Sequence, residues 1–339
     1  SYLRGNFDGF EKDLFSAFMI RDLGLTKESG QLGFMSPFVW MFISSYEELR
    51  RHFIDNATLT SLVQLEYSGF DGATVPICAF TLSKQQLVKF WGSYVRLSNF
   101  RGADQQGPRT LEAIRNPSCG WFYTSKQEDF KKIPGSPIAY WVTEKMRLAF
   151  LGADPLGKIA QPRQGMATTN NSLFVRLWFE CSRSNTDFTA TSGIEALESR
   201  AKWFPYNKGG DFRRWYGNNL FVVNYENAGK TICDYIDNTP GVNVGSNGRV
   251  INREKYFKPS ITWSKISSSS PAFRYIPNGF IFDVAGTSIF FDSIPLQNYV
   301  LGFCNSSVAT KILQILSPTL NFEVGHISTL PIKKHVNSE

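Results

Sequence analysis

The spacing of apolar residues in the first part of the chain changes period several times. Between residues 11 and 23 they recur at intervals of three and four, which predicts an amphipathic helix. Residues 33–37 form a short apolar run that ends at a proline and predicts a buried strand. Residues 59–66 and 75–82 predict two more strands joined by a loop. Residues 1–82 therefore alternate helix and strand as in an α/β sandwich, but they hold too few strands for a whole doubly wound domain.

A further helix is expected between the first two of these strands. Ser45 and Glu48 have the spacing of a capping box, in which each side chain accepts a hydrogen bond from the other residue's backbone N–H. Tyr46, Leu49 and Phe53 then form a single apolar stripe. This stripe predicts the face of the helix that packs on the sheet.

The remainder of the chain has a different pattern. Residues 83–150 are punctuated by glycine and proline, and they predict a connector with helices around 126–132 and 143–150. From about residue 155 to 295, short aromatic and β-branched runs alternate with Gly/Asn turns, which predicts a mostly β region. Residues 296–316 return to helical spacing and stop at a Ser-Pro pair.

Composition indicates a folded chain with a local basic excess. Of the 339 residues, 42% are hydrophobic, 19% are charged and 15% are aromatic, which excludes a disordered chain. The net charge of +7 is modest, but residues 202–274 hold eleven Lys or Arg against five Asp or Glu. This distribution fits a nucleic-acid partner without requiring one.

Cysteine and histidine usage argues against a disulfide framework and a zinc site. The five cysteines are widely spaced, no CxxC pair occurs, and there are only three histidines. Reduced thiols in the cytoplasm are the expected state. No apolar run reaches the length of a membrane span and no signal peptide opens the chain, so no membrane partner is expected.

No catalytic motif can be read from the residues. The sequence contains no GxGxxG, P-loop, HExxH or GxSxG string. The histidine count nearly excludes a hydrolytic triad, and His326 is expected to have a structural role.

Four segments carry a resemblance to a known family. Residues 33–41, GFMSPFVWM, resemble a late strand and the following turn in adenine-specific DNA methyltransferases. Residues 316–332, LSPTLNFEVGHISTLPI, resemble the closing segment of the target-recognition domain shared by TaqI-type methyltransferases and restriction specificity subunits. Residues 165–171, GMATTNN, and 202–210, KWFPYNKGG, are similar to PglX-type enzymes, the large methyltransferases of BREX phage-defence systems.

This resemblance implies a fold and a division into domains. The expected fold is an α/β partial methyltransferase sandwich followed by a mostly β (α+β) target-recognition domain with a C-terminal helix. Residues 1–115 would be the C-terminal part of an incomplete class I methyltransferase domain, residues 116–332 the TaqI-like recognition domain, and residues 333–339 a tail. The implied function is the C-terminal portion of an N6-adenine-specific DNA methyltransferase in a phage-defence or restriction-modification system.

The resemblance also shows which parts are not in this sequence. Such enzymes carry a glycine-containing loop for S-adenosylmethionine and an Asn-Pro-Pro-Tyr tetrad that accepts hydrogen bonds from the adenine amine. Neither occurs here, and Asn116–Cys119 is no substitute because it has neither the second proline nor the aromatic residue. We expect the first residue to lie just downstream of the tetrad. The chain alone is therefore expected to hold no catalytic residue, to bind no S-adenosylmethionine, and to bind DNA without methylating it.

One catalytic-domain feature is expected in this chain. Methylation of a base in a duplex requires its extrusion from the stack, and an aromatic ring can hold the extruded base. In the resembled family, an aromatic residue in the loop between two late strands does this, and Phe70 of Gly69-Phe70-Asp71 is the match. The alternative is that Phe70 caps the hydrophobic sheet.

Two clusters have the make-up of DNA contacts, with basic groups for phosphates and amides for base edges. Residues 163–171 combine a glycine with short polar side chains, although an ordinary turn is an equal alternative. Residues 202–216 interleave basic residues with aromatics at a Gly-Gly turn, and the alternative is a solvated face with Trp203 and Trp215 in the core. The candidate DNA-binding residues are Arg163, Gln164, Thr168, Asn170, Asn171, Lys202, Lys208, Arg213 and Arg214.

A third candidate is the segment from Ser260 to Arg274, where Lys265 precedes a run of serines at 267–270. This loop could enter a groove of DNA, or it could be a linker.

The alternative functions are a DNA-reading specificity subunit and an aromatic-rich carbohydrate-binding protein. Residues 33–37 and the Phe70 loop argue against the specificity subunit, which lacks both. The expected partners are double-stranded DNA and the missing N-terminal part of the same enzyme. Other BREX components and phage DNA-mimic inhibitors are further candidates.

Overall fold

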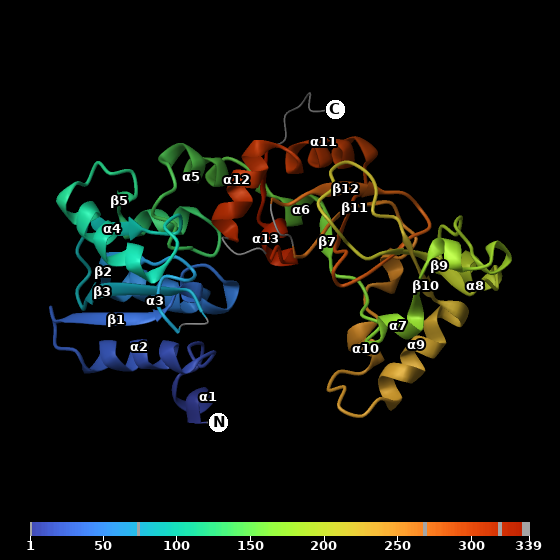
Figure 1. Ribbon diagram of the computed structural model, residues 1–339, viewed down its shortest axis with the longest axis horizontal. Coiled ribbons are helices and arrows are strands. Elements are labelled where there is room, and N and C mark those ends of the chain that lie inside the picture. Colours follow the sequence, from blue (N-terminus) through green and yellow to red (C-terminus); the bar gives the residue numbers. More distant parts are fainter. Residues whose placement is uncertain (1, 73–74, 267–269, 318–320, 334–339) are drawn as a thin grey trace. The chain divides into compact units, whose positions relative to one another are not determined.

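The computed structural model describes residues 2–72, 75–266, 270–317 and 321–333, and the chain forms two compact units (Figure 1). Unit 1 comprises residues 1–152 and unit 2 residues 153–339. The predicted boundary between 115 and 116 therefore falls inside unit 1. The reason is that residues 122–125 pair with the sheet of unit 1, so the chain does not leave this unit after residue 115.

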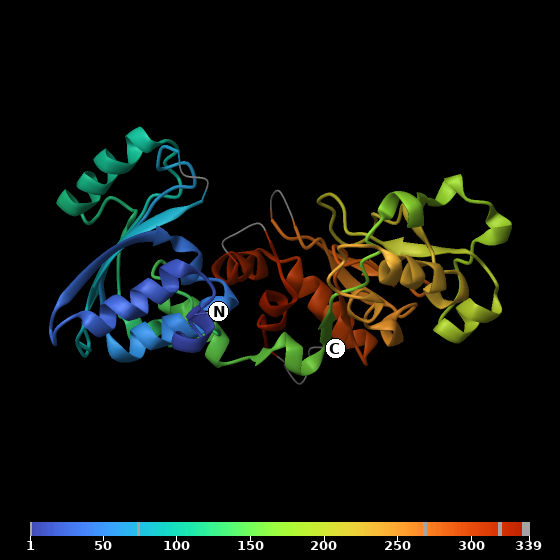
Figure 2. The ribbon, with the colours of Figure 1, turned by 90° about the horizontal axis from the view of Figure 1, so that it is seen from below.

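Unit 1 is a five-stranded sheet with helices on both faces (Figure 2). Its helices are α1 (Tyr2–Asn6), α2 (Leu14–Leu25), α3 (Glu47–Asn56), α4 (Ala103–Arg115) and α5 (Glu144–Leu151), and the 3₁₀ helices are η1 (Phe38–Met41), η2 (Ser44–Tyr46) and η3 (Gln127–Lys132). Its strands are β1 (Gln31–Pro37), β2 (Thr58–Gln64), β3 (Ile77–Ser83), β4 (Gly92–Arg96) and β5 (Phe122–Ser125).

The strand order of this sheet is β1-β3-β2-β4-β5. Strand β3 is antiparallel to both β1 and β2, whereas β4 is parallel to β2. Strands β1, β2 and β4 therefore run in one direction, and their carboxyl ends lie at the same edge of the sheet. We call this the carboxyl edge of unit 1. It is defined by Pro37, Gln64 and Arg96.

The two faces of the sheet bury different cores. On one face, α2 and α3 pack on a large cluster that includes Leu49, Phe53, Leu62 and Phe80. On the other face, Ala113 of α4 packs in a smaller cluster with apolar residues at the end of β4. The predicted stripe of Tyr46, Leu49 and Phe53 is buried, as expected.

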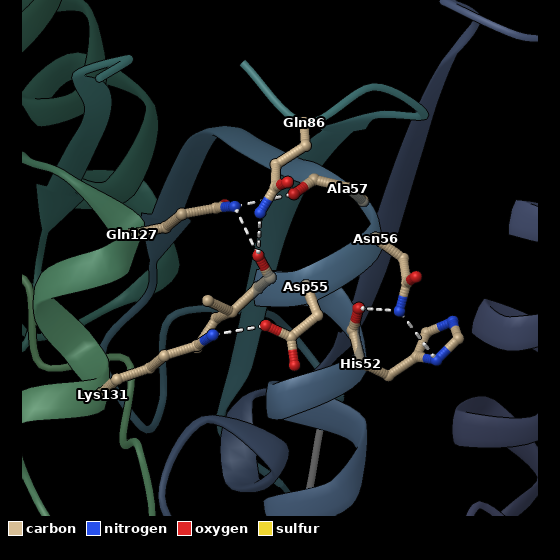
Figure 3. Close-up of polar contacts among 8 residues, drawn as sticks. His52, Asp55, Asn56, Ala57, Gln86, Gln127 and Lys131 are labelled. Carbon is tan, nitrogen blue, oxygen red and sulfur yellow. Dashed lines mark hydrogen bonds and ion pairs between the residues drawn. The ribbon is translucent and has the colours of Figure 1, made fainter. Parts of the chain in front are cut away.

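Side chains from distant segments satisfy the carbonyl end of α3 (Figure 3). Gln127 donates to the carbonyl oxygens of Ile54 at 3.1 Å and Ala57 at 2.7 Å, and Gln86 donates to Ile54 at 3.3 Å. Lys131 forms an ion pair with Asp55 on the same turn. A helix leaves its last carbonyls without intrahelical partners. These contacts therefore anchor the segments around Gln86 and Gln127 to the end of α3.

Two predictions for unit 1 are wrong. The capping box at Ser45 does not form, because Ser45 lies inside η2 and α3 begins at Glu47 with no side-chain cap. Residues 83–150 are not a connector, since they supply β4, α4 and β5. The misleading signal was Pro108, which lies inside α4 rather than at a break.

Unit 2 contains two four-stranded sheets and a two-stranded one. The sheet orders are β13-β9-β10-β8, β12-β11-β14-β7 and β15-β6. The strands are β6 (Asp154–Pro155), β7 (Gln161–Arg163), β8 (Val175–Leu177), β9 (Trp203–Asn207), β10 (Phe221–Asn224), β11 (Ser260–Trp263), β12 (Phe273–Ile276), β13 (Ile281–Phe282), β14 (Ser288–Phe290) and β15 (Pro331–Ile332).

Helices surround these sheets. They are α6 (Leu156–Ile159), α7 (Asn171–Phe174), α8 (Gly193–Glu198), α9 (Glu226–Asn238), α10 (Ser246–Arg249), α11 (Ile294–Cys304), α12 (Ser307–Leu316) and α13 (Val324–Ser328), with 3₁₀ helices η4 (Trp178–Glu180), η5 (Arg183–Asn185) and η6 (Arg253–Lys255).

The mixture of sheets and helices agrees with an α+β region, but α8 and α9 were not predicted. The single predicted helix at 296–316 is two helices. Asn305 breaks it because its side chain bonds the backbone of Phe273 in both directions, accepting at 3.1 Å and donating at 2.9 Å. Ser306 then caps α12.

Candidate nucleic-acid interface

Phe70 lies in the loop that follows β2 at the carboxyl edge of unit 1. Phe70 is 49% exposed, so about half of its surface is open to contact with a ligand. In open α/β sheets, ligands bind outside the carboxyl ends of parallel strands. The loop therefore presents an aromatic ring where such a sheet binds its ligand. The base-stacking role stays a prediction.

Gln106 of α4 holds the Phe70 loop in place through hydrogen bonds to the backbone. The buried amide accepts a hydrogen bond from the N–H of Glu66 at 3.1 Å and donates to the carbonyl oxygens of Phe100 and Gly102 at 2.6 and 2.8 Å. A Cβ at Gly69 would lie 2.9 Å from both the Gln106 side chain and the Glu66 carbonyl oxygen, so glycine is needed for this approach. The position of the exposed ring is thus set by a buried contact.

Polar and aromatic side chains lie beneath the carboxyl edge. The hydroxyl of Tyr140 donates to Gln64 at 2.8 Å, and its ring stacks on Tyr94 with centroids 4.6 Å apart. Burial raises the pKa of Tyr140 well above the usual value, so the phenol stays neutral and serves as a donor. The guanidinium of Arg96 lies over the ring of Trp141, 4.1 Å from its centroid.

In unit 2, the backbone of residues 163–171 is held against β13. A Cβ at Gly165 would lie 1.9 Å from the carbonyl oxygen of Phe282, which explains the glycine. Met166 donates to Phe282 at 2.9 Å and accepts from Val284 at 3.0 Å. The glycine thus serves close packing inside the unit.

The candidate side chains of this first cluster have mixed surroundings. Thr168 is buried and donates to Asn171 at 2.8 Å. Asn170 caps α7 and donates to the hydroxyl of Tyr235 at 3.0 Å. Arg163 and Asn171 are exposed, and Gln164 is half-buried. Arg163 and Asn171 are therefore the most accessible members of the cluster.

The second cluster contains an ion pair that lies within unit 2. Lys208 lies 3.3 Å from the buried carboxylate of Asp283, which also accepts a 2.6 Å hydrogen bond from Tyr206. Because Asp283 also forms a β-bridge with Met166, it joins the first two candidate clusters. Lys202 is half-buried beside Trp203, with its ammonium 5.7 Å from the ring centroid.

The segment from Gly209 to Leu220, here named the arginine-aromatic loop, is the most exposed part of the second cluster. Phe212, Trp215 and Tyr216 are 52%, 54% and 58% exposed, and Arg213 is also exposed. Arg214 lies 5.4 Å from the ring centroid of Phe212. The alternative that Trp215 belongs to the core is wrong, because more than half of its side chain faces solvent.

Buried Arg274 supports this loop from β12. Its guanidinium donates to the carbonyl oxygen of Arg213 and to the hydroxyl of Ser264, both at 3.3 Å. Ser264 in turn donates to Gly210 at 2.6 Å, and Trp215 pairs with the backbone on both sides of Arg274. Burial, reinforced by the nearby charge of Arg213, lowers the pKa of Arg274 to about 10, so it remains charged at neutral pH.

The third candidate segment, Ser260 to Arg274, contacts the arginine-aromatic loop through Ser264 and Arg274. Lys265 forms a 3.1 Å ion pair with Glu323, so its ammonium already has a partner. Of the predicted serine run, residues 267–269 lie outside the described part of the chain. The sequence did not single out Asp283, Arg274 or Gln106. A charged residue within an apolar run was a usable signal for Asp283 and Arg274, whereas Gln106 lies in a polar stretch that gives no such signal.

Among the described residues, no His, Cys, Asp or Glu side chains form a group of three or more that could hold a metal ion. The five cysteines are free thiols. His326 has a structural contact, since its Nδ1 accepts the N–H of Glu323 at 3.2 Å. No helix in the described ranges is long and apolar enough to cross a membrane.

Comparison with known proteins relates this architecture to DNA-modifying enzymes. Residues 1–70 match the family model of the Eco57I restriction-modification methylase. The type IIL restriction-modification enzyme MmeI, solved in complex with DNA, aligns with 95% of this chain and 41% of its own, with 11% identity and a TM-score of 0.59. At that identity the likeness shows the fold alone. The class of fold is thus that of restriction-modification methyltransferases.

The sequence relatives are more specific. The chain is 38% identical over 328 residues to the adenine-specific methyltransferase PglX of Lacticaseibacillus casei (strain Zhang), a match that covers 96% of this chain and 27% of PglX. It is 31% identical over 345 residues to the adenine-specific methyltransferase BrxX of Escherichia coli O9:H4 (strain HS), covering 100% of this chain and 26% of BrxX. The predicted resemblance to PglX-type adenine-specific methyltransferases is confirmed, and the chain spans about a quarter of the length of these relatives.

Proposed function

We propose that this chain is the C-terminal portion of an N6-adenine-specific DNA methyltransferase of a phage-defence system. In this proposal, unit 1 supplies the late strands of the catalytic domain and holds the extruded base on Phe70, and unit 2 recognises the DNA target. The arginine-aromatic loop is the observation that carries the DNA-binding part. It presents basic groups and large exposed rings on a backbone held by a buried arginine, and the sequence similarity to PglX supports the assignment.

The chemistry of the arginine-aromatic loop suits DNA. Arginine binds phosphates and the edge of guanine in a bidentate manner, and exposed aromatic rings stack on bases or insert at base steps. Arg213 and Arg214 supply the charge, and Trp215 supplies the largest ring. Arg163, Asn171 and Lys202 are proposed as further DNA contacts because they remain accessible. Thr168, Lys208 and Lys265 are proposed to affect DNA binding indirectly, because their contacts within unit 2 position the backbone of the candidate segments.

Titration of the chain with a labelled duplex in fluorescence anisotropy, at several salt concentrations, tests DNA binding. The wild-type affinity is expected to fall as salt rises. R213Q is expected to reduce the magnitude of the slope of log K against log salt by about 0.9, the value for one lost phosphate contact. W215A is expected to weaken binding equally at every salt concentration, because stacking releases no counterion.

K230Q is the matched control. Lys230 is an exposed residue of α9 that pairs with Asp234 four residues away, so its loss should leave both affinity and slope unchanged. DNA affinity that is independent of salt, or equal in R213Q, W215A and K230Q, contradicts the proposed role of unit 2.

A duplex with one unpaired 2-aminopurine tests the role of Phe70 in the intact enzyme. Wild type is expected to bind this duplex more tightly than the fully paired one and to change the 2-aminopurine fluorescence on binding. F70A should remove the fluorescence change. Y67A is the control because Tyr67 lies in the same loop and is 64% exposed. An unchanged signal in F70A overturns base stacking by Phe70.

We further propose that S-adenosylmethionine is held by the intact enzyme outside this chain. The cofactor's ribose hydroxyls call for a free carboxylate, as in other nucleotide-binding α/β folds. In the Phe70 loop, the Glu66 carboxylate already accepts both the N–H and the hydroxyl of Ser68. The glycine-containing cofactor loop of the resembled enzymes does not occur in this sequence, which supports the proposal. Methyl transfer to DNA by the isolated chain would contradict this assignment.

A further inference from the structure

The carboxyl edge of unit 1 contains an arginine that has no anionic partner among the described residues. Arg96 ends β4, and its side chain forms no ion pair and no hydrogen bond with any residue of those ranges. Its Nε is buried and unsatisfied. A buried arginine donor without an acceptor is costly and calls for a ligand or an ordered water.

The orientation of Arg96 is fixed by Trp141. The guanidinium carbon lies 4.1 Å from the centroid of the Trp141 ring, and Trp141 packs in turn against Phe42. A guanidinium whose face is covered by an indole presents its N–H groups edgewise. That arrangement suits bidentate binding of a planar or tetrahedral oxyanion, and it reduces the entropy lost when the anion binds.

Arg96 also lies beside the start of the Phe70 loop. It is the register partner of Gln64 in the parallel pair β2–β4, and the N–H of the following residue, Leu97, donates to the Gln64 carbonyl oxygen at 2.9 Å. The loop with Phe70 begins directly after Gln64. The Phe70 loop and Arg96 therefore belong to neighbouring strand ends of the same edge.

We propose that Arg96, held by Trp141, binds a backbone phosphodiester of the nucleotide whose base is extruded onto Phe70. This inference rests on the proposed function, because the extruded nucleotide brings its phosphates to this edge. Phe70 then holds the base, and Arg96 is a positioning residue that holds the backbone in its rotated conformation. Arg96 would then hold the phosphate, and Phe70 the base, of the same nucleotide.

The test uses the intact enzyme and the duplex with one unpaired 2-aminopurine. R96Q is expected to weaken its binding by about tenfold or more, as for the loss of a charged hydrogen bond, and to reduce the magnitude of the salt slope by about 0.9. At saturating enzyme, the 2-aminopurine signal should equal that of wild type, since Phe70 is intact. R96K should keep the wild-type slope while binding more weakly, because lysine retains the charge but not the bidentate fork.

R115Q is the control, since Arg115 is an exposed residue at the end of α4 on the opposite face of the sheet. If R96Q binds the duplex with the same affinity and the same salt slope as wild type, the proposal for Arg96 is overturned, while stacking on Phe70 is unaffected. A lower melting temperature of R96Q with unchanged DNA binding also overturns it and assigns Arg96 a role in stability alone. Failure of wild type to distinguish the two duplexes overturns base extrusion at this edge, and the phosphate contact with it.

Discussion

A single arginine joins two segments that build the carboxyl edge. Arg50 is 1% exposed, and it donates to the carbonyl oxygens of Trp40 and Ile43 at 2.7 and 2.8 Å and to Gly135 through two nitrogens. Burial lowers its pKa to about 10, so the side chain is still charged at neutral pH. The chain beyond Gly135 leads to the aromatic residues beneath the edge, so Arg50 supports their placement.

Replacement of this arginine by methionine should be strongly destabilising. R50M leaves three buried or partly buried carbonyl groups without their side-chain donor, and we expect the free energy of unfolding of unit 1 to fall by about 3 kcal/mol or more. Urea denaturation of the full chain measures this loss. R51M removes a neighbouring arginine that is exposed and paired with Glu47, so it should change stability by less than about 0.5 kcal/mol. Equal losses in the two variants would show that the burial of Arg50 has no special role.

At the scale of an element, helix α13 depends on a neutral histidine. Burial lowers the pKa of His326 below its usual 6.5, and Nδ1 accepts the N–H of Glu323 at the start of the helix. Protonation turns this nitrogen into a donor and breaks that contact. Because the folded-state pKa is depressed, the stability contribution is present above about pH 6.5 and is lost as pH falls through the folded-state value.

Thermal unfolding between pH 7.5 and 5.5 measures this effect. The melting temperature of wild type should fall more steeply with acid than that of H326Q, because glutamine keeps an acceptor and does not titrate. H52Q is the comparison variant, because burial also lowers the pKa of His52 in unit 1 and this variant measures the share of that second histidine. If wild type and H326Q decline in parallel, the contact between His326 and Glu323 has no part in the pH dependence.

Elements with one dominant periodic pattern could be predicted from the sequence, and elements set by distant partners could not. Strand β1 and helix α3 follow from their apolar spacing. Strand β4 was missed because its short run gains strand character from parallel pairing with β2, a contact between segments far apart in sequence. Helix α4 was missed because Gly107 and Pro108 lie inside it.

The candidate site shows the same limit. Phe70 could be singled out because an aromatic residue between glycine and aspartate in a loop is poorly placed for packing, and the structure leaves it half exposed. Thr168 and Lys208 have the composition of DNA contacts, but their partners Asn171 and Asp283 occupy them inside the unit. Composition identifies a polar group, whereas its availability depends on the tertiary neighbours that sequence does not specify.

For the whole molecule, the separate cores of the two units predict two unfolding events. Leu62 is buried in the core of unit 1 and Ile261 is buried in unit 2, and each unit has its own set of internal contacts. Truncation of a buried aliphatic side chain to alanine costs about 2–5 kcal/mol. L62A should therefore lower the unfolding temperature of one transition in calorimetry and leave the other unchanged, whereas I261A should have the opposite effect. A single transition that either substitution shifts equally would show that the chain unfolds as one cooperative body, which contradicts the division at residue 152.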